Sequence, residues 1–149
     1  MADSIRETIL KEFCLRVGAA VGILKAQRSR SSEEKLQQSE LPMAIIQALT
    51  EVPTQNTSTC KIDKKLLVAV LVCVHAEIAD EAADPIITDI HKRLMPTVNG
   101  FVDTTLGGLP GVQDVREAGI NFKPDAVDGI AAMTYEVAFR HSVGDPTVL

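Results

Sequence analysis

Three histidines and three cysteines are the residues of this chain that could build a metal site. Cys73 and His75 alternate along a predicted strand, so their side chains share one face, a spacing that two zinc ligands could use. His91 and His141 lie elsewhere, and no CxxC pair or HExxH motif accompanies them. We therefore predict a buried thiol and a surface imidazole, with no metal and no cofactor.

The residue types needed for catalysis are present without a catalytic pattern. No GxSxG segment occurs, and no cysteine has a basic flank that would clearly lower the pKa of its thiol. Glu77, Asp80, Glu81 and Asp84 cluster in AEIADEAAD, but carboxylates beside a helix start are explained by the helix dipole and by solubility. We predict no catalytic residues and no enzyme activity.

Phosphate and nucleic-acid binding are also disfavoured. The glycines of GGLPG lack both the P-loop lysine and the GxGxxG spacing, so turn formation suffices to explain them. The net charge is −5, and the basic residues between Arg28 and Lys35 are mixed with acidic ones and lack aromatic platforms for bases. We therefore do not expect this chain to bind DNA tightly as a ligand.

The first half of the chain predicts one helix and two strands. Ser4 and Glu7 have the spacing of a capping box, and apolar residues then recur at helical spacing, so we expect a helix over 5–17. A short strand over 23–27 precedes a charged, serine-rich segment around 28–40, which we expect to be a mobile loop. Leu41-Pro42 should open the next strand, MAIIQAL, and VPTQNTST should form a turn or loop.

The second half predicts a long strand, a helix and two more strands. LLVAVLVCV, within 62–78, is typical of a central strand covered on both faces. Asp84-Pro85 should start a helix that ends near Met95-Pro96. A strand over 112–122 should be broken or bulged at Ala118-Gly119, and AAMTYEVAFRHS alternates as a final strand.

These elements predict an α+β fold with a single mixed or antiparallel sheet of about four to five strands and two main helices packed on one face. The 149 residues, 46% of them hydrophobic, suit a single domain over 1–149. No apolar run reaches the ~20 residues that span a bilayer, and no secretion signal is expected. Cys14, Cys60 and Cys73 cannot all pair, which favours a reducing compartment.

Five segments together resemble the tail-terminator, or tail-completion, proteins of long-tailed bacteriophages. They are the IRETILKEF helix, the strand begun by Leu41-Pro42, KIDKKLLVAVLVCV, the ADPIITDIHKRLM helix and the closing TYEVAFRHSVGDP. The closing segment is the most specific of them. The resemblance covers nearly the whole chain, and small neck or minor tail proteins of the same phages share the architecture.

The resemblance implies a structural virion protein that forms a ring, usually hexameric, which caps the tail tube and ends its polymerisation. Its partners would be further copies of itself, the tail-tube protein and a head-completion or neck protein, with DNA as passing cargo and no membrane. It would be found at the head-proximal end of the virion tail, and in the host cytoplasm during assembly. A lumen without net positive charge would let DNA pass without adhering to the wall.

Two alternatives stay open at this stage. One is another phage neck or minor tail adaptor of similar fold, and the other is a small-ligand-binding or enzymatic domain, in which Tyr135 would be the first suspect. Exposure arguments place subunit or partner contacts in the charged loop, on the polar face of the second helix and near the end of the last strand. These candidates are Arg28, Arg30, Glu33, Glu34, Lys35, Asp84, Asp89, Lys92, Arg93 and Arg140.

Overall fold

The computed structural model describes residues 2–28, 41–58, 60–75, 79–125 and 128–149. Its elements are α1 (Ile5–Gly18), β1 (Lys25–Arg28), β2 (Met43–Ser58), β3 (Lys61–His75), α2 (Ala79–Leu94), β4 (Thr97–Val98), β5 (Phe101–Val102), β6 (Val112–Asp125) and β7 (Asp128–Ser142).

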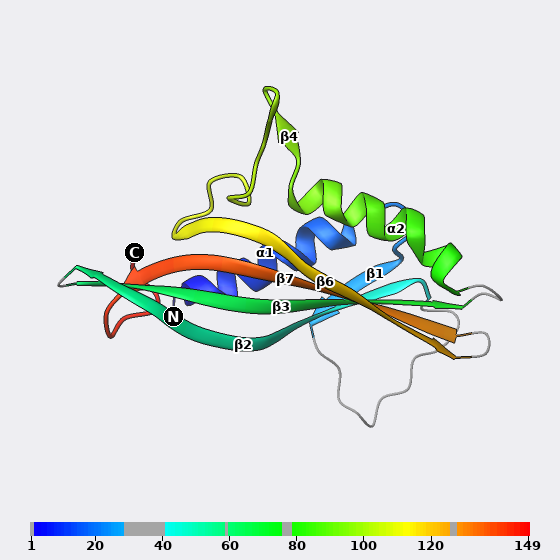
Figure 1. Cartoon of the computed structure of the whole chain (residues 1–149), viewed down its shortest axis with the longest axis horizontal. Coiled ribbons are helices and arrows are strands. Elements are labelled where there is room, and N and C mark those ends of the chain that lie inside the picture. Colours follow the sequence, from blue (N-terminus) through cyan, green and yellow to red (C-terminus); the bar gives the residue numbers. More distant parts are fainter. Residues whose placement is uncertain (1, 29–40, 59, 76–78, 126–127) are drawn as a thin grey trace.

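One five-stranded sheet, in the order β1-β2-β3-β7-β6, organises the chain. Neighbouring strands are antiparallel except β1 and β2, which run parallel, so the sheet is mixed. Both helices lie on the same side of this sheet (Figure 1). The predicted α+β class is confirmed.

α1 forms where the capping pattern predicts it. The Ser4 hydroxyl accepts a hydrogen bond from the Glu7 backbone N–H at 3.1 Å, which satisfies one of the unpaired donors at the helix start. The apolar face of the helix is buried, and its members are Ile5, Ile9, Leu10, Phe13 and Val17.

The central strands β3 and β7 supply most of the surface that the helices cover. Along β7 every second side chain is buried, as the alternation predicts, and the facing positions of β3 are buried as well. These side chains join those of α1 and α2 in one cluster that includes Leu66, Val68, Val70, Val72, Met133, Tyr135, Val137 and Phe139. The other side of the sheet holds a small second cluster of Met43, Ile45 and Cys73.

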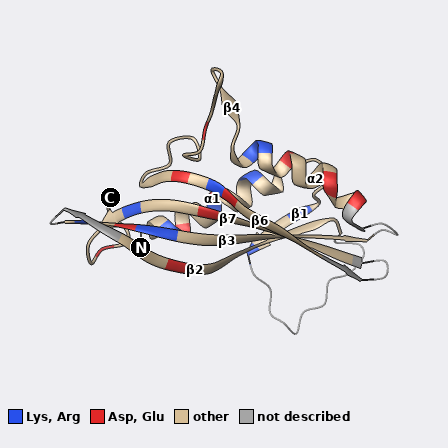
Figure 2. Ribbon diagram, viewed as in Figure 1, with Lys and Arg blue, Asp and Glu red and all other residues tan. Residues whose placement is uncertain are grey.

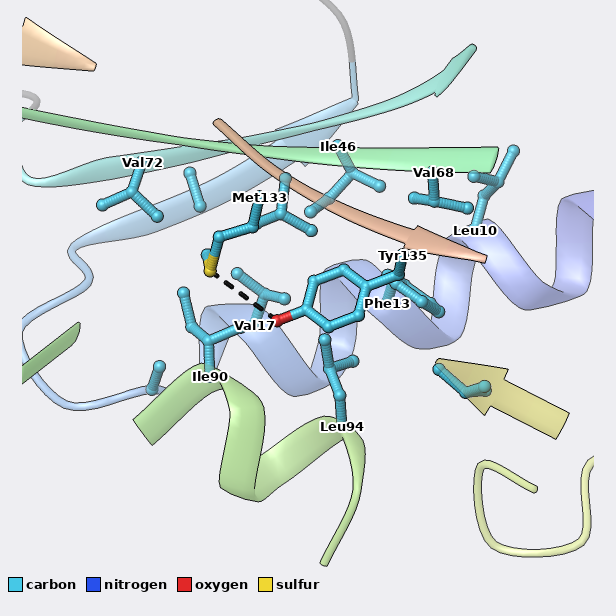
Figure 3. Close-up of a cluster of buried hydrophobic side chains, with 14 of the residues drawn as sticks. Leu10, Phe13, Val17, Ile46, Val68, Val72, Ile90, Leu94, Met133 and Tyr135 are labelled. Atoms are coloured by element: carbon cyan, nitrogen blue, oxygen red, sulfur yellow. Dashed lines mark hydrogen bonds between the residues drawn. The ribbon is translucent and has the colours of Figure 1, made fainter. Parts of the chain in front are cut away.

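Tyr135 lies at the centre of the larger cluster, between the sheet and both helices (Figure 3). Its ring is fully buried and meets the Phe13 ring edge to face at a centroid distance of 5.8 Å. Its hydroxyl is hydrogen-bonded to Nδ1 of His91 at 2.5 Å and donates to Sδ of Met133 at 3.6 Å. Burial raises the pKa of Tyr135 well above its usual value, so the group is a neutral core residue.

Two boundaries predicted from the sequence are wrong. VPTQNTST is not a turn, because β2 continues to Ser58 and pairs with β3 along its length. Register shifts beside Pro53 and Asn56 accommodate the proline and the neighbouring polar residues within the strand pair. Because these residue types are typical of loops, the strand is not recognisable in the sequence. Asp84 is not a helix cap, since α2 begins at Ala79 and contains Pro85; alanines at 82 and 83 favour helix, and Ala83 packs in the core.

Other features of the prediction hold. The bulge in β6 lies between Glu117 and Gly119, as expected. Cys73 is a buried thiol, whereas His75 is exposed at the end of β3. The part of the predicted long strand beyond His75, residues 76–78, lies outside the described residues. Within the described ranges, neither helix has the length and apolarity required to span a membrane.

Replacing Tyr135 with Phe should lower the free energy of unfolding by about 1 kcal/mol, because Nδ1 of His91 loses its hydrogen-bond partner while the ring stays in place. Tyr135→Ala should cost about 3–5 kcal/mol through the cavity that it leaves. Urea unfolding measures both. Thr134→Val, on the other side of the same strand, is the matched control and should change stability little; equal stability of Tyr135→Phe and wild type would contradict the role given to the hydroxyl.

Candidate functional site

The contact residues predicted on α2 divide between exposed and internally paired side chains. Asp84 and Lys92 are exposed. Asp89 accepts hydrogen bonds from Nε of Arg93 and from the Val21 backbone N–H, both at 2.8 Å. The Arg93 bond and the Val21 bond lower the pKa of Asp89. Asp89 therefore ties α2 to the loop that follows α1, and a role of this pair toward a partner stays a prediction.

The charged segment that follows β1 is described only at its start. Arg28 ends β1, and its Nη1 donates to the Glu7 carboxylate of α1 at 2.7 Å. Arg30, Glu33, Glu34 and Lys35 lie outside the described residues. Arg28 is thus placed against α1, and the contact role of this segment stays a prediction.

Arg140 lies on the side of the sheet that faces away from the helices, far from the α2 residues. Its Nε donates to the Asp63 carboxylate at 2.6 Å, which holds the pKa of Asp63 below its usual value. Two further ion pairs share this uncovered face: Lys65 with Glu136 at 3.2 Å, and Arg116 with Asp114 at 2.7 Å. The predicted contact residues are therefore not gathered into one site.

A shallow depression of about 220 Å³ lies among these charges, lined by Lys65, Gln113, Asp114, Arg116, Glu136 and Ala138. Its acidic and basic groups neutralise one another in pairs, and five of its six lining residues are charged or polar. Exposed ion pairs of this kind contribute little to stability. The chemistry of the depression suits contact with another protein surface, since among the described residues that line it Ala138 is the one aliphatic residue and none is aromatic, whereas small-molecule pockets are lined mainly by apolar and aromatic side chains.

The β4–β5 hairpin is a surface feature that the sequence analysis missed. It projects from the body of the protein beyond the end of α2 (Figure 1). Asn99 and Gly100 form its two-residue turn, with φ of 51° and 81°. Its exposed apolar side chains are Val98, Phe101 and Val102. The signal was available, because Asn-Gly between apolar residues is the strongest short-range indication of a hairpin.

A compact turn fixes the base of this hairpin. The Asp103 backbone N–H donates to the Pro96 carbonyl at 2.7 Å, which closes the ribbon. The Asp103 carboxylate accepts from the hydroxyl and the N–H of Thr105 and from the Gly107 N–H, at 2.7–2.9 Å. The bonds from Thr105 are the main cause of a lowered pKa for Asp103. These bonds order the turn that follows the hairpin, and Leu106 of the same turn is buried in the core.

The described histidines and acidic residues do not converge on a metal. Within residues 2–28, 41–58, 60–75, 79–125 and 128–149, no group of three or more His, Cys, Asp or Glu is placed to hold one. His91 is engaged by Tyr135 and, through Nε2, by Glu117 at 3.1 Å. His141 is buried, with Nδ1 against the Ser142 carbonyl at 2.6 Å.

Comparison with known proteins gives similarity to solved structures and none to a known sequence family. No protein-family model matches the chain, and no curated protein matches it. Among solved structures, a chain in "Virion of native gene transfer agent (GTA) particle" is similar at 8% sequence identity, with 92% of each chain covered and a TM-score of 0.49. A likeness at this level assigns no role, so the proposal below stands on the sequence and the molecular surface.

Asp103→Ala should loosen the hairpin while the sheet stays intact, because three hydrogen bonds at its base lose their acceptor. We expect amide hydrogen exchange over residues 97–107 to become roughly 5- to 30-fold faster at neutral pH, the equivalent of about 1–2 kcal/mol. Asp145→Ala is the matched control, since Asp145 accepts equivalent bonds from Thr147 in a turn elsewhere.

The effect of Asp103→Ala should depend on pH with a definite sign. The folded-state pKa of Asp103 is lowered, so its contribution is present above the unfolded value of about 3.9 and is lost as the pH falls through the folded value. The difference in hairpin opening between wild type and Asp103→Ala should therefore shrink below about pH 4. A difference that grows on acidification would contradict this account.

Proposed function

We propose that this chain is a ring-forming structural protein of a long-tailed phage or phage-like particle that caps the tail tube, ends tube polymerisation and offers the surface for head joining. The observation that carries the proposal is the exposed apolar surface of the β4–β5 hairpin on a protein of 149 residues. An exposed apolar projection of this kind is typical of a subunit that is completed by a protein partner.

The resemblance to tail-terminator proteins supports the same role. Four of the segments that carry it correspond to α1, the start of β2, β3 and β7, and the fifth corresponds to α2 with an earlier start. The closing segment is the β7 strand followed by a turn at Gly144, whose φ is +80°. The resemblance therefore rests on ordered elements in the expected order.

Capping a tube requires a closed assembly and no bond chemistry. A head-to-tail contact between different surfaces of identical subunits closes into a ring when its rotation suits, and otherwise grows into a filament. A ring, usually hexameric in this family, would match the end of the tube and present its other side to a head-completion or neck protein. The net charge of −5 suits a channel through which DNA passes without binding.

Light scattering coupled to size exclusion, over a concentration series with and without purified tail-tube protein, tests the proposal. We expect either a discrete multimer of the 16.1 kDa chain or a monomer that forms a closed ring on tube ends. A multimer that ignores tubes but binds a neck protein would favour the adaptor alternative. A monomer that remains indifferent to tubes at every concentration would contradict the tail-capping role.

A further inference from the structure

Two of the chain's aromatic side chains lie on the surface. The sequence has four phenylalanines, one tyrosine and no tryptophan. Phe13, Tyr135 and Phe139 are fully buried, whereas Phe101 is 79% exposed and Phe122 is 47% exposed. Aromatic residues are enriched at the centres of protein interfaces, where they supply large apolar area. With so few aromatics in the chain, these two mark the surfaces to be explained.

Phe101 lies on the projecting hairpin, which we call the arm and define as residues 97–102. Phe101 is paired with Val98 across the ribbon, so both side chains share one face, while Val102 lies on the other. The ribbon therefore presents apolar groups on both faces. Because a two-stranded ribbon buries little of its own surface, the arm is suited to insertion against a partner.

Phe122 belongs to a second surface, the edge patch, which consists of Ile120 and Phe122 on β6. Both side chains are exposed, and their spacing of two places them on one face of the strand. β6 lies at one edge of the sheet, and its register with Met133 and Ala131 places the patch on the helix side. In Figure 1 this end of β6 and the start of α2 lie toward the same end of the molecule.

The two ends of α2 carry charges of opposite sign, and one end lies next to the arm while the other lies toward the edge patch. Lys92 and Arg93 are in its last turn, directly before the arm. Glu81 and Asp84 are exposed in its first half, toward the end of the molecule that carries the edge patch. Figure 2 shows α2 changing from basic below the arm to acidic at its start. The end of α2 beside the arm thus carries the exposed Lys92 next to the Arg93–Asp89 ion pair, and its first half carries the exposed carboxylates of Glu81 and Asp84.

We propose that the arm of one copy binds the edge patch of a second copy, with Phe101 against Phe122 and Lys92 near the acidic first half of α2 in that second copy. The apolar surfaces match, and the surrounding charges are complementary, which favours one register and fast association. Because arm and patch are different surfaces, each copy uses one with each neighbour, and the contact is head-to-tail. The inference rests on the proposed ring assembly and names the contact that would build it.

Phe101→Asp and Phe122→Asp test the contact by light scattering at several concentrations. We expect each variant to stay monomeric at concentrations where the wild type associates, with association at least about 10-fold weaker and the urea midpoint unchanged. Val143→Asp is the control, because Val143 is 54% exposed in the C-terminal turn, away from both surfaces, and it should associate as the wild type does. Phe101→Ser is a second, milder variant of the arm and should give the same result.

Mixing the two variants gives the sharper test. Phe101→Asp keeps an intact patch and Phe122→Asp keeps an intact arm, so the mixture should form a heterodimer with one sound contact and grow no further. The inference is overturned if the wild type is multimeric and the Phe101→Asp variant associates equally well. It is also overturned if the mixture of the two variants stays monomeric. Either result leaves the ring proposal standing. A wild type that is monomeric both with and without tubes would instead contradict the proposed function itself.

Discussion

Burial of one side of the β3–β7 pair beneath two helices is the interaction on which the remaining structure depends. The helix-facing side chains of both strands are almost fully excluded from water, and Tyr135 closes the centre with its ring against Phe13 and its hydroxyl against His91. Each buried aliphatic or aromatic side chain contributes roughly 1.5–3 kcal/mol. The other strands of the five-stranded sheet are held in place because β2 and β6 pair directly with this central pair and β1 pairs with β2.

The same arrangement determines which surfaces are left for partners. Helices cover one side of the sheet, while the other side carries cross-strand ion pairs such as Arg140 with Asp63. The β4–β5 hairpin leaves the body directly after α2, and the turn that follows it is ordered by Asp103 and anchored in the core by Leu106. The apolar side chains of the hairpin are therefore exposed beside the body, which suits assembly with other subunits better than chemistry in a pocket.

The sequence predicts those elements whose local pattern agrees with their tertiary environment. The Ser4 cap defines the start of α1, and the alternation from Met133 to Phe139 identifies the buried side of β7, because both patterns report burial directly. The second half of β2 is not predictable in this way. Its polar residues and Pro53 have the composition of a loop, and pairing with β3 outweighs that local preference.

The candidate surfaces were less predictable than the fold. Charge and exposure identified Asp89 and Arg93, which the structure pairs with each other, so charge alone does not separate a partner contact from an internal ion pair. The arm was visible as Val98-Asn99-Gly100-Phe101, but its exposure depends on where α2 ends relative to the sheet. Association between copies depends on surfaces from distant parts of the chain, and no local pattern reports that.

Electron microscopy of purified tail tubes incubated with the protein tests the central claim most directly. The proposed role predicts a ring of added density at one end of each tube and no further elongation when tube protein is supplied. Density along the tube wall, or tubes with bare ends that continue to grow, would contradict the claim that this chain caps the tail.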